Sequence, residues 1–262
     1  MQNWCNIDFA SILFAGEVIE DILRHGPHDN RVSSEETSIP TQATGGKGTA
    51  IRRGVLYNKQ KEFQKAIDWL KEASKRYYKE GSQEANEIKL LIAKTYQDEG
   101  NWPEAEKLYH EIESQYPKSP VALQVPLLVA SHYQALNEND KANQILQDAL
   151  AQYKKIQDEN PKSRISKYAK QFTNVAYGQR GEWNQVLTNI DNDIASQTVS
   201  ANKGNYLFLK AMVTANGAKD SGKAIELYRE FLKQYPDHPL ASLAEKNIQI
   251  LSAGIGAPSS TK

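Results

Sequence analysis

The chain has 262 residues, with 32 basic and 32 acidic side chains and 24% charged residues. This length suits one elongated domain or two compact ones. The balanced charge provides no overall positive field of the kind that drives nonspecific binding to nucleic acid, so we expect no nucleic-acid partner. Cys5 is the only cysteine, which excludes an intramolecular disulfide framework and a zinc site built on paired cysteines.

Residues 1–29 are predicted to contain a short amphipathic helix. Apolar side chains recur at helical intervals over residues 7–23, and His25-Gly26-Pro27 ends the pattern. No basic residue precedes this stretch and Asp8 and Glu17 interrupt it, unlike a secretion signal. Nowhere do about 18 uninterrupted apolar residues predict a direct membrane span. As the sequence is written, we expect a cytoplasmic protein, with a periplasmic one as the alternative if the true N-terminus lies upstream.

Residues 30–48 contain many Ser, Thr and Gly and few large apolar groups, which predicts a flexible linker. The segment TGGKGT within it has part of a phosphate-binding loop. That motif requires a Gly five residues before Gly46 and a Ser or Thr directly after Lys47. Thr41 and Gly48 occupy those positions, so a linker is favoured over a phosphate site.

From residue 49 to residue 251 helical periodicity is nearly continuous, and four stretches align with one another. Each has a Tyr three residues after its first position and a small or aliphatic residue nine residues after that Tyr. This pattern predicts helix pairs, in which small residues lie where the helices cross and the Tyr fills the space between neighbouring pairs. The stretches are GVLYNKQKEFQKAIDWLKEA from Gly54, AKTYQDEGNWPEAEKLYHEI from Ala93, ASHYQALNENDKANQILQDA from Ala130 and NVAYGQRGEWNQVLTNIDND from Asn174.

The turn inside each pair is marked by Gly100, by Gly181 and by Asn137-Glu138-Asn139. Trp102 and Trp183 each open a second helix after a glycine turn. Their shared position favours packing within the hairpin over stacking on nucleic-acid bases.

A fifth pair is predicted over NYLFLKAMVTAN and KAIELYREFLKQYPDHP, with Ala224 and Tyr228 at the repeated positions. The following DHPLASLAEKNIQILSAG predicts a C-terminal capping helix that Asp237 caps and Gly254 ends. Residues 252–262 are predicted to be a disordered tail.

These residues resemble the tetratricopeptide repeat (TPR), whose signature pairs a small residue and a Tyr on the first helix with an Ala, an aromatic residue and a terminal Pro on the second. The second unit matches best, through Ala93, Tyr96, Ala105, Tyr109 and Pro117. The resemblance implies an all-α fold, a right-handed superhelical solenoid of about five TPR-like helical hairpins with a C-terminal capping helix, over residues 49–251. Successive tyrosines are 39, 37 and 44 residues apart, more than the roughly 34 of the standard repeat, which predicts longer second helices or looser joints.

No catalytic set of side chains emerges from the sequence. Only His25 and His28 are close together among the five histidines, and they lack a third ligand, so a solvated pair is favoured over a metal site. Carboxylates are interspersed with lysines at helical intervals, as in Glu104, Glu106 and Lys107, which is typical of a solvated helix face. We therefore expect no enzyme, no cofactor and no metal.

The resemblance implies that the first helices line a concave groove that holds a peptide or helix of a partner protein. In relatives that clamp the acidic C-terminal tails of chaperones this groove carries Lys and Asn, but here Ile51 and Val55 occupy the leading places, so a different ligand is expected. The predicted groove residues are Val55, Asn58, Lys94, Gln97, Ser131, Gln134, Gln171 and Val175.

The leading hypothesis for function is a scaffold or adaptor that binds a partner polypeptide in this groove. The endings SQYPKSPVA, DENPKSRIS and KQYPDHPLA resemble those of TPR proteins of the bacterial cell envelope, including lipoproteins that help to assemble outer-membrane barrels. A cell-envelope assembly factor is therefore the alternative. A self-associating structural subunit and a noncatalytic subunit of a larger enzyme also remain open, as do the partner and the oligomeric state.

Overall fold

The computed structural model of the protein describes residues 47–196 and 200–255, and all the regular elements in this part of the chain are α-helices. The all-α class predicted from the sequence is confirmed. The predicted helix within residues 1–29 and nearly all of the predicted linker lie outside the described residues. The helices are α3 (Lys47–Lys59), α4 (Phe63–Tyr77), α5 (Gln83–Glu99), α6 (Trp102–Gln115), α7 (Pro120–Ala135), α8 (Asn139–Glu159), α9 (Arg164–Gln179), α10 (Trp183–Ser196), α11 (Ser200–Asn216), α12 (Ser221–Gln234) and α13 (Ala241–Ile255).

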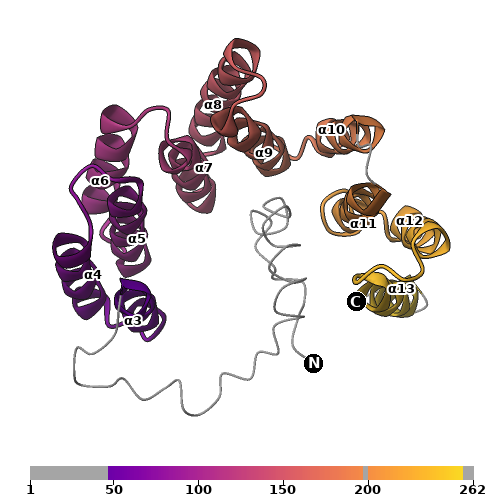
Figure 1. Ribbon diagram of the computed structural model, residues 1–262, viewed down its shortest axis with the longest axis horizontal. Helices are drawn as coiled ribbons and strands as arrows, with labels where there is room; N and C mark the ends of the chain where they lie inside the picture. The colour runs from indigo at the N-terminus through magenta and orange to yellow at the C-terminus, as the bar shows by residue number, and fades with distance from the viewer. Residues whose placement is uncertain (1–46, 197–199, 256–262) are drawn as a thin grey trace. The chain divides into compact units, whose positions relative to one another are not determined.

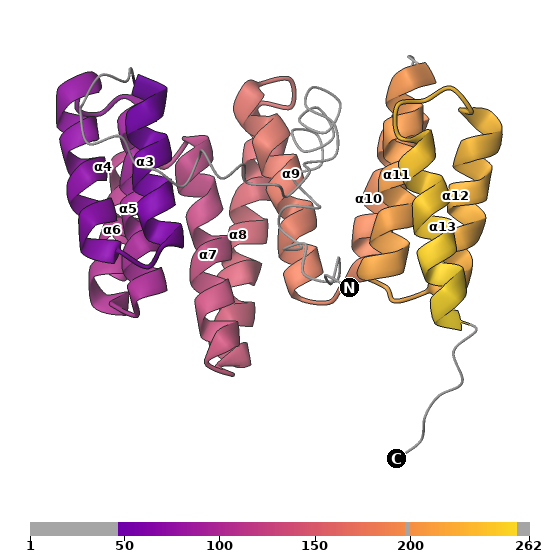
Figure 2. The ribbon, with the colours of Figure 1, turned by 90° about the horizontal axis from the view of Figure 1, so that it is seen from below.

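The chain forms two compact units that divide within α9, after Lys170. We call the described residues 47–170 the N-terminal unit and the described residues from 171 onward the C-terminal unit. In the N-terminal unit α3 packs on α4, α5 on α6 and α7 on α8 (Figure 1). In the C-terminal unit α10 packs on α11, α11 on α12 and α12 on α13 (Figure 2). The predicted pairs α3–α4, α5–α6, α7–α8 and α11–α12 are thus observed, and a hydrogen bond between Asn189 and Asn174 joins α10 to α9.

The turn inside each of the first four pairs has the same backbone conformation. The residue four positions after the repeated Tyr has a positive φ, and the next amide donates a hydrogen bond to the Tyr carbonyl, as Glu62 does to Tyr57 at 2.9 Å. Glycine adopts this left-handed conformation without strain, Asn is tolerated, and Lys adopts it only when its surroundings impose it. The four residues are Lys61 (61°), Gly100 (88°), Asn137 (62°) and Gly181 (73°).

The joint between one pair and the next is capped by a serine. The hydroxyl oxygens of Ser82, Ser119 and Ser163 each accept a hydrogen bond, at 3.1 Å, from the backbone amide three residues later. This satisfies one of the amides that the first turn of a helix leaves unpaired. Two of the three endings noted in the sequence therefore contain the cap that starts the following helix, at Ser119 and Ser163.

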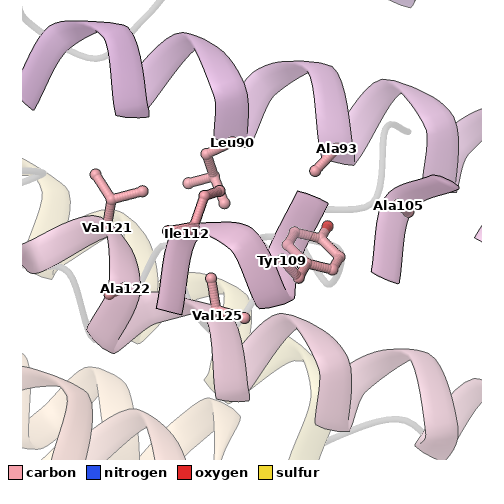
Figure 3. Close-up of a cluster of buried hydrophobic side chains, with 8 residues drawn as sticks. All are labelled: Leu90, Ala93, Ala105, Tyr109, Ile112, Val121, Ala122 and Val125. Atoms are coloured by element: carbon pink, nitrogen blue, oxygen red, sulfur yellow. The ribbon is translucent and has the colours of Figure 1, made fainter. Parts of the chain in front are cut away.

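The core of the second pair joins three helices (Figure 3). Ala105 lies where α6 crosses α5 and is fully buried, and Tyr109 fills the space beside it. The hydroxyl of Tyr109 donates a hydrogen bond of 2.8 Å to Oε1 of Gln97 on α5. Small residues at the crossing and large ones beside it let the helices approach closely, as the sequence predicted. The cluster consists of Leu90, Ala93, Ala105, Tyr109, Ile112, Val121, Ala122 and Val125.

Both ends of the repeat region differ from the prediction. The first helix begins at Lys47, inside the predicted linker. The last helix continues to Ile255, into the predicted disordered tail. Gly254 does not end it, because it lies within the helix and its φ is not left-handed. A glycine near a helix end predicts a stop only when the chain adopts that conformation.

The start of α13 also differs. The helix begins at Ala241, and the Asp237 cap predicted from the sequence is not formed. Instead Nδ1 of His238 accepts a hydrogen bond from the Leu240 amide at 3.2 Å. This joint, residues 235–240, is longer than the three joints that a serine caps, and His238 occupies the place of the capping serine.

The capping role predicted for α13 follows from its register. The segments from Tyr116 and from Tyr235 share the spacing Tyr-Pro-x-x-Pro, so α7 and α13 can be aligned. Positions of α7 that are buried in the third pair are polar in α13: Leu123, Leu127 and Ala130 correspond to Ser242, Lys246 and Gln249. A polar side in place of the packing side is what a terminal element of a repeat array requires.

Candidate partner-binding face

The first helices of the N-terminal unit adjoin one another. α3 contacts α5 and α5 contacts α7, whereas α4, α6 and α8 do not pack on one another to the same extent. Nδ2 of Asn58 on α3 donates a hydrogen bond of 2.6 Å to Oδ2 of Asp98 on α5. We call the surface of α3, α5 and α7 away from their second helices the first-helix face.

Six of the predicted groove residues lie in the N-terminal unit at equivalent register positions on these three helices. Lys94 and Ser131 are exposed, and the others are half-buried. Gln97 has a structural task as well, because its Oε1 accepts the Tyr109 hydroxyl while its amide nitrogen remains a potential donor. The six residues are Val55 and Asn58 on α3, Lys94 and Gln97 on α5, and Ser131 and Gln134 on α7.

The other two predicted groove residues, Gln171 and Val175, belong to the C-terminal unit. Gln171 is half-buried. Val175 is only 2% exposed, which contradicts its assignment to a solvent-facing groove. Its neighbours Phe172 and Ala176 are buried too. The register position that holds an exposed polar residue in α5 and in α7 thus belongs to a buried apolar side of α9.

The fourth pair is adapted to its unusual side chains. Asn174 replaces the small residue of the other units, and its Oδ1 accepts a hydrogen bond of 2.7 Å from Nδ2 of Asn189 on α10. Asp193 on α10 is buried although its side chain carries a carboxylate. Lys210 on α11 forms an ion pair with Asp191 at 2.6 Å. Polar contacts thus help to hold α10 against both α9 and α11, whereas the contacts in the core of the second pair are mainly apolar.

An aromatic cluster that sequence reasoning missed joins the second and third pairs. The rings of Trp102 and His132 are stacked, with centroids 3.5 Å apart and an interplanar angle of 3°. The Tyr133 hydroxyl donates to Glu106 at 3.1 Å, and the Lys141 ammonium lies 3.7 Å from the Tyr133 ring centroid. Trp102 therefore packs across the joint between pairs as well as inside its own hairpin. No feature of the sequence pairs these positions, which are 30 residues apart.

The cluster affects the titration of its histidine. Burial lowers the pKa of His132, because the charged imidazolium is poorly solvated there, and the Lys141 ammonium acts in the same direction. The carboxylates of Glu106 and Glu138 partly offset this by favouring the charged form. The lowered pKa favours the neutral imidazole, which stacks on Trp102 as a largely apolar ring.

The described residues offer little to support other kinds of site. Among residues 47–196 and 200–255, no three His, Cys, Asp or Glu side chains gather in a way that would hold a metal ion. A surface depression of about 650 Å³ is lined by residues of α6 alone, including Lys107, His110 and Glu113. Over the same part of the chain, none of the helices combines the length and the apolar character needed to cross a bilayer.

Two segments match the family model of the tetratricopeptide repeat, residues 88–119 and residues 206–238. The first covers most of α5 and all of α6, the pair that fits the repeat signature best, and the second covers most of α11 and all of α12. The protein therefore contains tetratricopeptide repeats, as the sequence resemblance predicted, and it folds as helical hairpins.

No curated protein matches the chain. Similar solved structures include the TPR-like repeats described as those of a Podosopora anserina kinesin light chain, at 14% identity, covering 72% of this chain and 93% of that one, with a TM-score of 0.46. A second structure of those repeats, at 13% identity, covers 80% and 96% with a TM-score of 0.40. BtubC (BKLC) from P. vanneervenii, at 14% identity, covers 100% and 96% with a TM-score of 0.39. These scores carry no functional inference, and the repeat assignment rests on the family match and the helix pairs.

Proposed function

We propose that the protein is a noncatalytic interaction scaffold that binds a segment of a partner protein on the first-helix face of its N-terminal unit. The observation that supports this most directly is that the position after the small residue is exposed on two adjoining first helices, as Lys94 on α5 and Ser131 on α7. Because α5 contacts α7, these side chains belong to one surface. Arrays of this kind commonly bind partners on such a surface.

The chemistry of the face suits a polypeptide. An extended segment carries peptide N–H and C=O groups that require hydrogen-bond partners. Ser131 and Gln134 carry side chains that can both donate and accept hydrogen bonds, and each also has an interaction within the protein. Lys94 adds a cation that favours a carboxylate of the ligand.

The repeated endings that resemble cell-envelope proteins have a local explanation. Ser119 and Ser163 within them cap the next helix, and His238 takes the same place in the third ending. Helix capping is a general requirement, so these endings give no independent support for a cell-envelope role.

A phage-displayed library of random peptides, selected on the immobilised full-length protein, tests the proposal. The double variant Lys94→Glu, Gln134→Ala should weaken the selected peptides at least tenfold, since each lost contact to a charged or polar group contributes about 1–3 kcal/mol. The matched control is Lys107→Glu, Gln147→Ala, which makes the same changes at exposed positions of α6 and α8. This control should bind like the wild type.

Two outcomes would count against the proposal. Selected peptides that bind the first double variant as tightly as the wild type, while circular dichroism shows it folded, would rule out the first-helix face. A library that yields no enriched peptide would argue against peptide binding altogether.

A further inference from the structure

Charge is distributed unevenly along a chain whose total charge is balanced. Residues 1–46 contain seven acidic and two basic side chains, whereas residues 47–170 contain 17 acidic and 21 basic ones. The net charges of these two parts are therefore −5 and +4. Opposite charges on two parts of one chain attract each other, most strongly at low ionic strength.

The basic charge is concentrated where the N-terminal unit begins. α3 has four basic and no acidic side chains. Arg52 and Lys59 are exposed and lie three residues before and four residues after Val55, which places all three on the same side of the helix. Lys94 is exposed at the register position on α5 that Val55 occupies on α3, and the two helices are in contact.

Val55 is the apolar centre of this area. Val55 is half-buried and apolar, whereas the side chains at the aligned positions, Lys94 in α5 and Ser131 in α7, are exposed and polar. Ile51, one turn earlier, is also half-buried. This part of the first-helix face therefore presents Val55 with the basic groups Arg52, Lys59 and Lys94 around it. The Asp98 carboxylate, which accepts a hydrogen bond from Asn58, is the acidic group among them, and Ile51 packs on the core beneath.

Residues 7–23 have the complementary composition. They contain four acidic and no basic side chains, and large apolar residues recur among them at helical intervals. As a helix, this segment would carry apolar side chains on most of its circumference, with Glu17 and Glu20 one and two turns after Leu13 on the same side. Its acidic residues are Asp8, Glu17, Glu20 and Asp21, and its apolar residues include Phe9, Ile12, Leu13, Ile19, Ile22 and Leu23.

We propose that residues 7–23 bind in cis to the part of the first-helix face formed by α3 and α5, and that they compete there with the partner protein. Their apolar side covers Val55, and their carboxylates pair with Arg52, Lys59 and Lys94. The competition rests on the proposed function of this face, whereas the docking itself does not.

The intervening chain has the length that this docking needs. Residues 24–46 number 23, and Gly/Ser-rich linkers of that many residues span roughly 25–30 Å on average. The 13-residue helix α3 is about 20 Å long. A tether of this kind gives an effective concentration on the order of millimolar, so even weak complementarity is enough for substantial occupancy.

The only cysteine makes a direct test possible, because Cys5 lies two residues before the segment. A nitroxide attached to Cys5 of the full-length protein broadens the amide NMR signals of residues near it. We expect broadening along α3 and α5 at low salt, reduced at 1 M salt, where the screening length falls to about 3 Å. Lys94→Glu should reduce it too. The matched control Lys107→Glu, an exposed position on α6, should not.

Three outcomes would overturn the docking: no broadening of α3 and α5, broadening confined to other helices, or broadening that Lys94→Glu leaves unchanged. A fourth outcome, docking of the segment from a second copy of the protein, is tested by mixing nitroxide-labelled protein with separately isotope-labelled protein. Broadening of equal strength in this mixture would show that a second copy, and not the same chain, supplies the segment.

The competition has its own readout, which uses the peptides selected from the library. If residues 7–23 occupy the face nine-tenths of the time, reversing their four acidic residues to lysine should tighten peptide binding about tenfold. Unchanged affinity together with the expected broadening would refute the competition and leave the docking intact. Broadening without any selectable peptide would refute the proposed function and leave the docking intact.

Discussion

Replacing Gly54 by alanine sets two effects of opposite sign against each other. Gly54 lies inside α3, where Ala has a better helix propensity than Gly by about 1 kcal/mol. A Cβ atom at this position would lie 2.5 Å from both Cγ and Cδ2 of Leu70 on α4. Carbon atoms prefer a separation of about 3.5–4.0 Å, so Leu70 or the helix must move by about 1 Å.

The surroundings decide which effect wins. Leu70 is 1% exposed and belongs to the core formed with Ile67, Ile88 and Ile92, so any shift of its side chain must be absorbed by other buried side chains. Overpacking of a tight core costs about 1–3 kcal/mol, which exceeds the gain in propensity. We expect Gly54→Ala to lower the free energy of unfolding by about 1 kcal/mol, measured by urea unfolding followed by circular dichroism.

A double-mutant cycle checks the cause. Leu70→Ala alone should lower the free energy of unfolding by about 2–5 kcal/mol. In the double variant the clash between Cβ of residue 54 and the Leu70 side chain is absent, so its loss of stability should be smaller than the sum of the two single losses by about 1–2 kcal/mol. Gly222→Ala is the control, because a Cβ there meets only Asp220 Oδ1, at 3.7 Å. An increase in stability for Gly54→Ala would refute this account of the close crossing of α3 and α4.

Three further predictions concern the packing inside the N-terminal unit. Ala105→Trp should cost roughly 1–3 kcal/mol or more because Ala105 is fully buried at a helix crossing; an unchanged thermal midpoint would show that the second unit is misaligned. Tyr153→Phe removes the hydrogen bond of 2.5 Å to the Leu123 carbonyl and should lower the free energy of unfolding by about 1 kcal/mol, a loss that urea titration would detect or exclude. His132 has a pKa below its ordinary value of 6.5 in the folded state, so between that lowered pKa and 6.5 the unfolded chain binds more protons. Stability should therefore fall as the pH drops below about 6.5, and His132→Phe, which keeps a ring stacked on Trp102, should show less of this fall in thermal melts at several pH values.

Much of the fold could be predicted because its determinants are local. The small residue at Ala93, the Tyr three residues later and Ala105 at the second crossing repeat along the chain, and a helix can approach another closely only at such positions. Trp102 and Trp183 were correctly placed at the first residue of a second helix. Local side-chain size and helical periodicity were sufficient for these features.

The candidate site was less accessible to such reasoning. The register placed Lys94 and Ser131 at exposed positions of adjoining helices, but the same register failed at Val175, which is buried. Position within a repeat predicts which side of its helix a residue occupies. It does not predict what covers that side, since this depends on the units before and after it.

The sequence by itself determined the helix pairs, the turns at Gly100, Gly181 and Asn137, and the polar side of the last helix, because each follows from residues close together in the chain. The tertiary structure alone decided that Lys61 adopts the left-handed conformation that glycine adopts at the equivalent turns. It alone stacked Trp102 on His132. In both cases the reason is physical: the packing of one helix on another, within the first pair for Lys61 and between the second and third pairs for Trp102, imposes a conformation or a contact that the neighbouring residues do not specify.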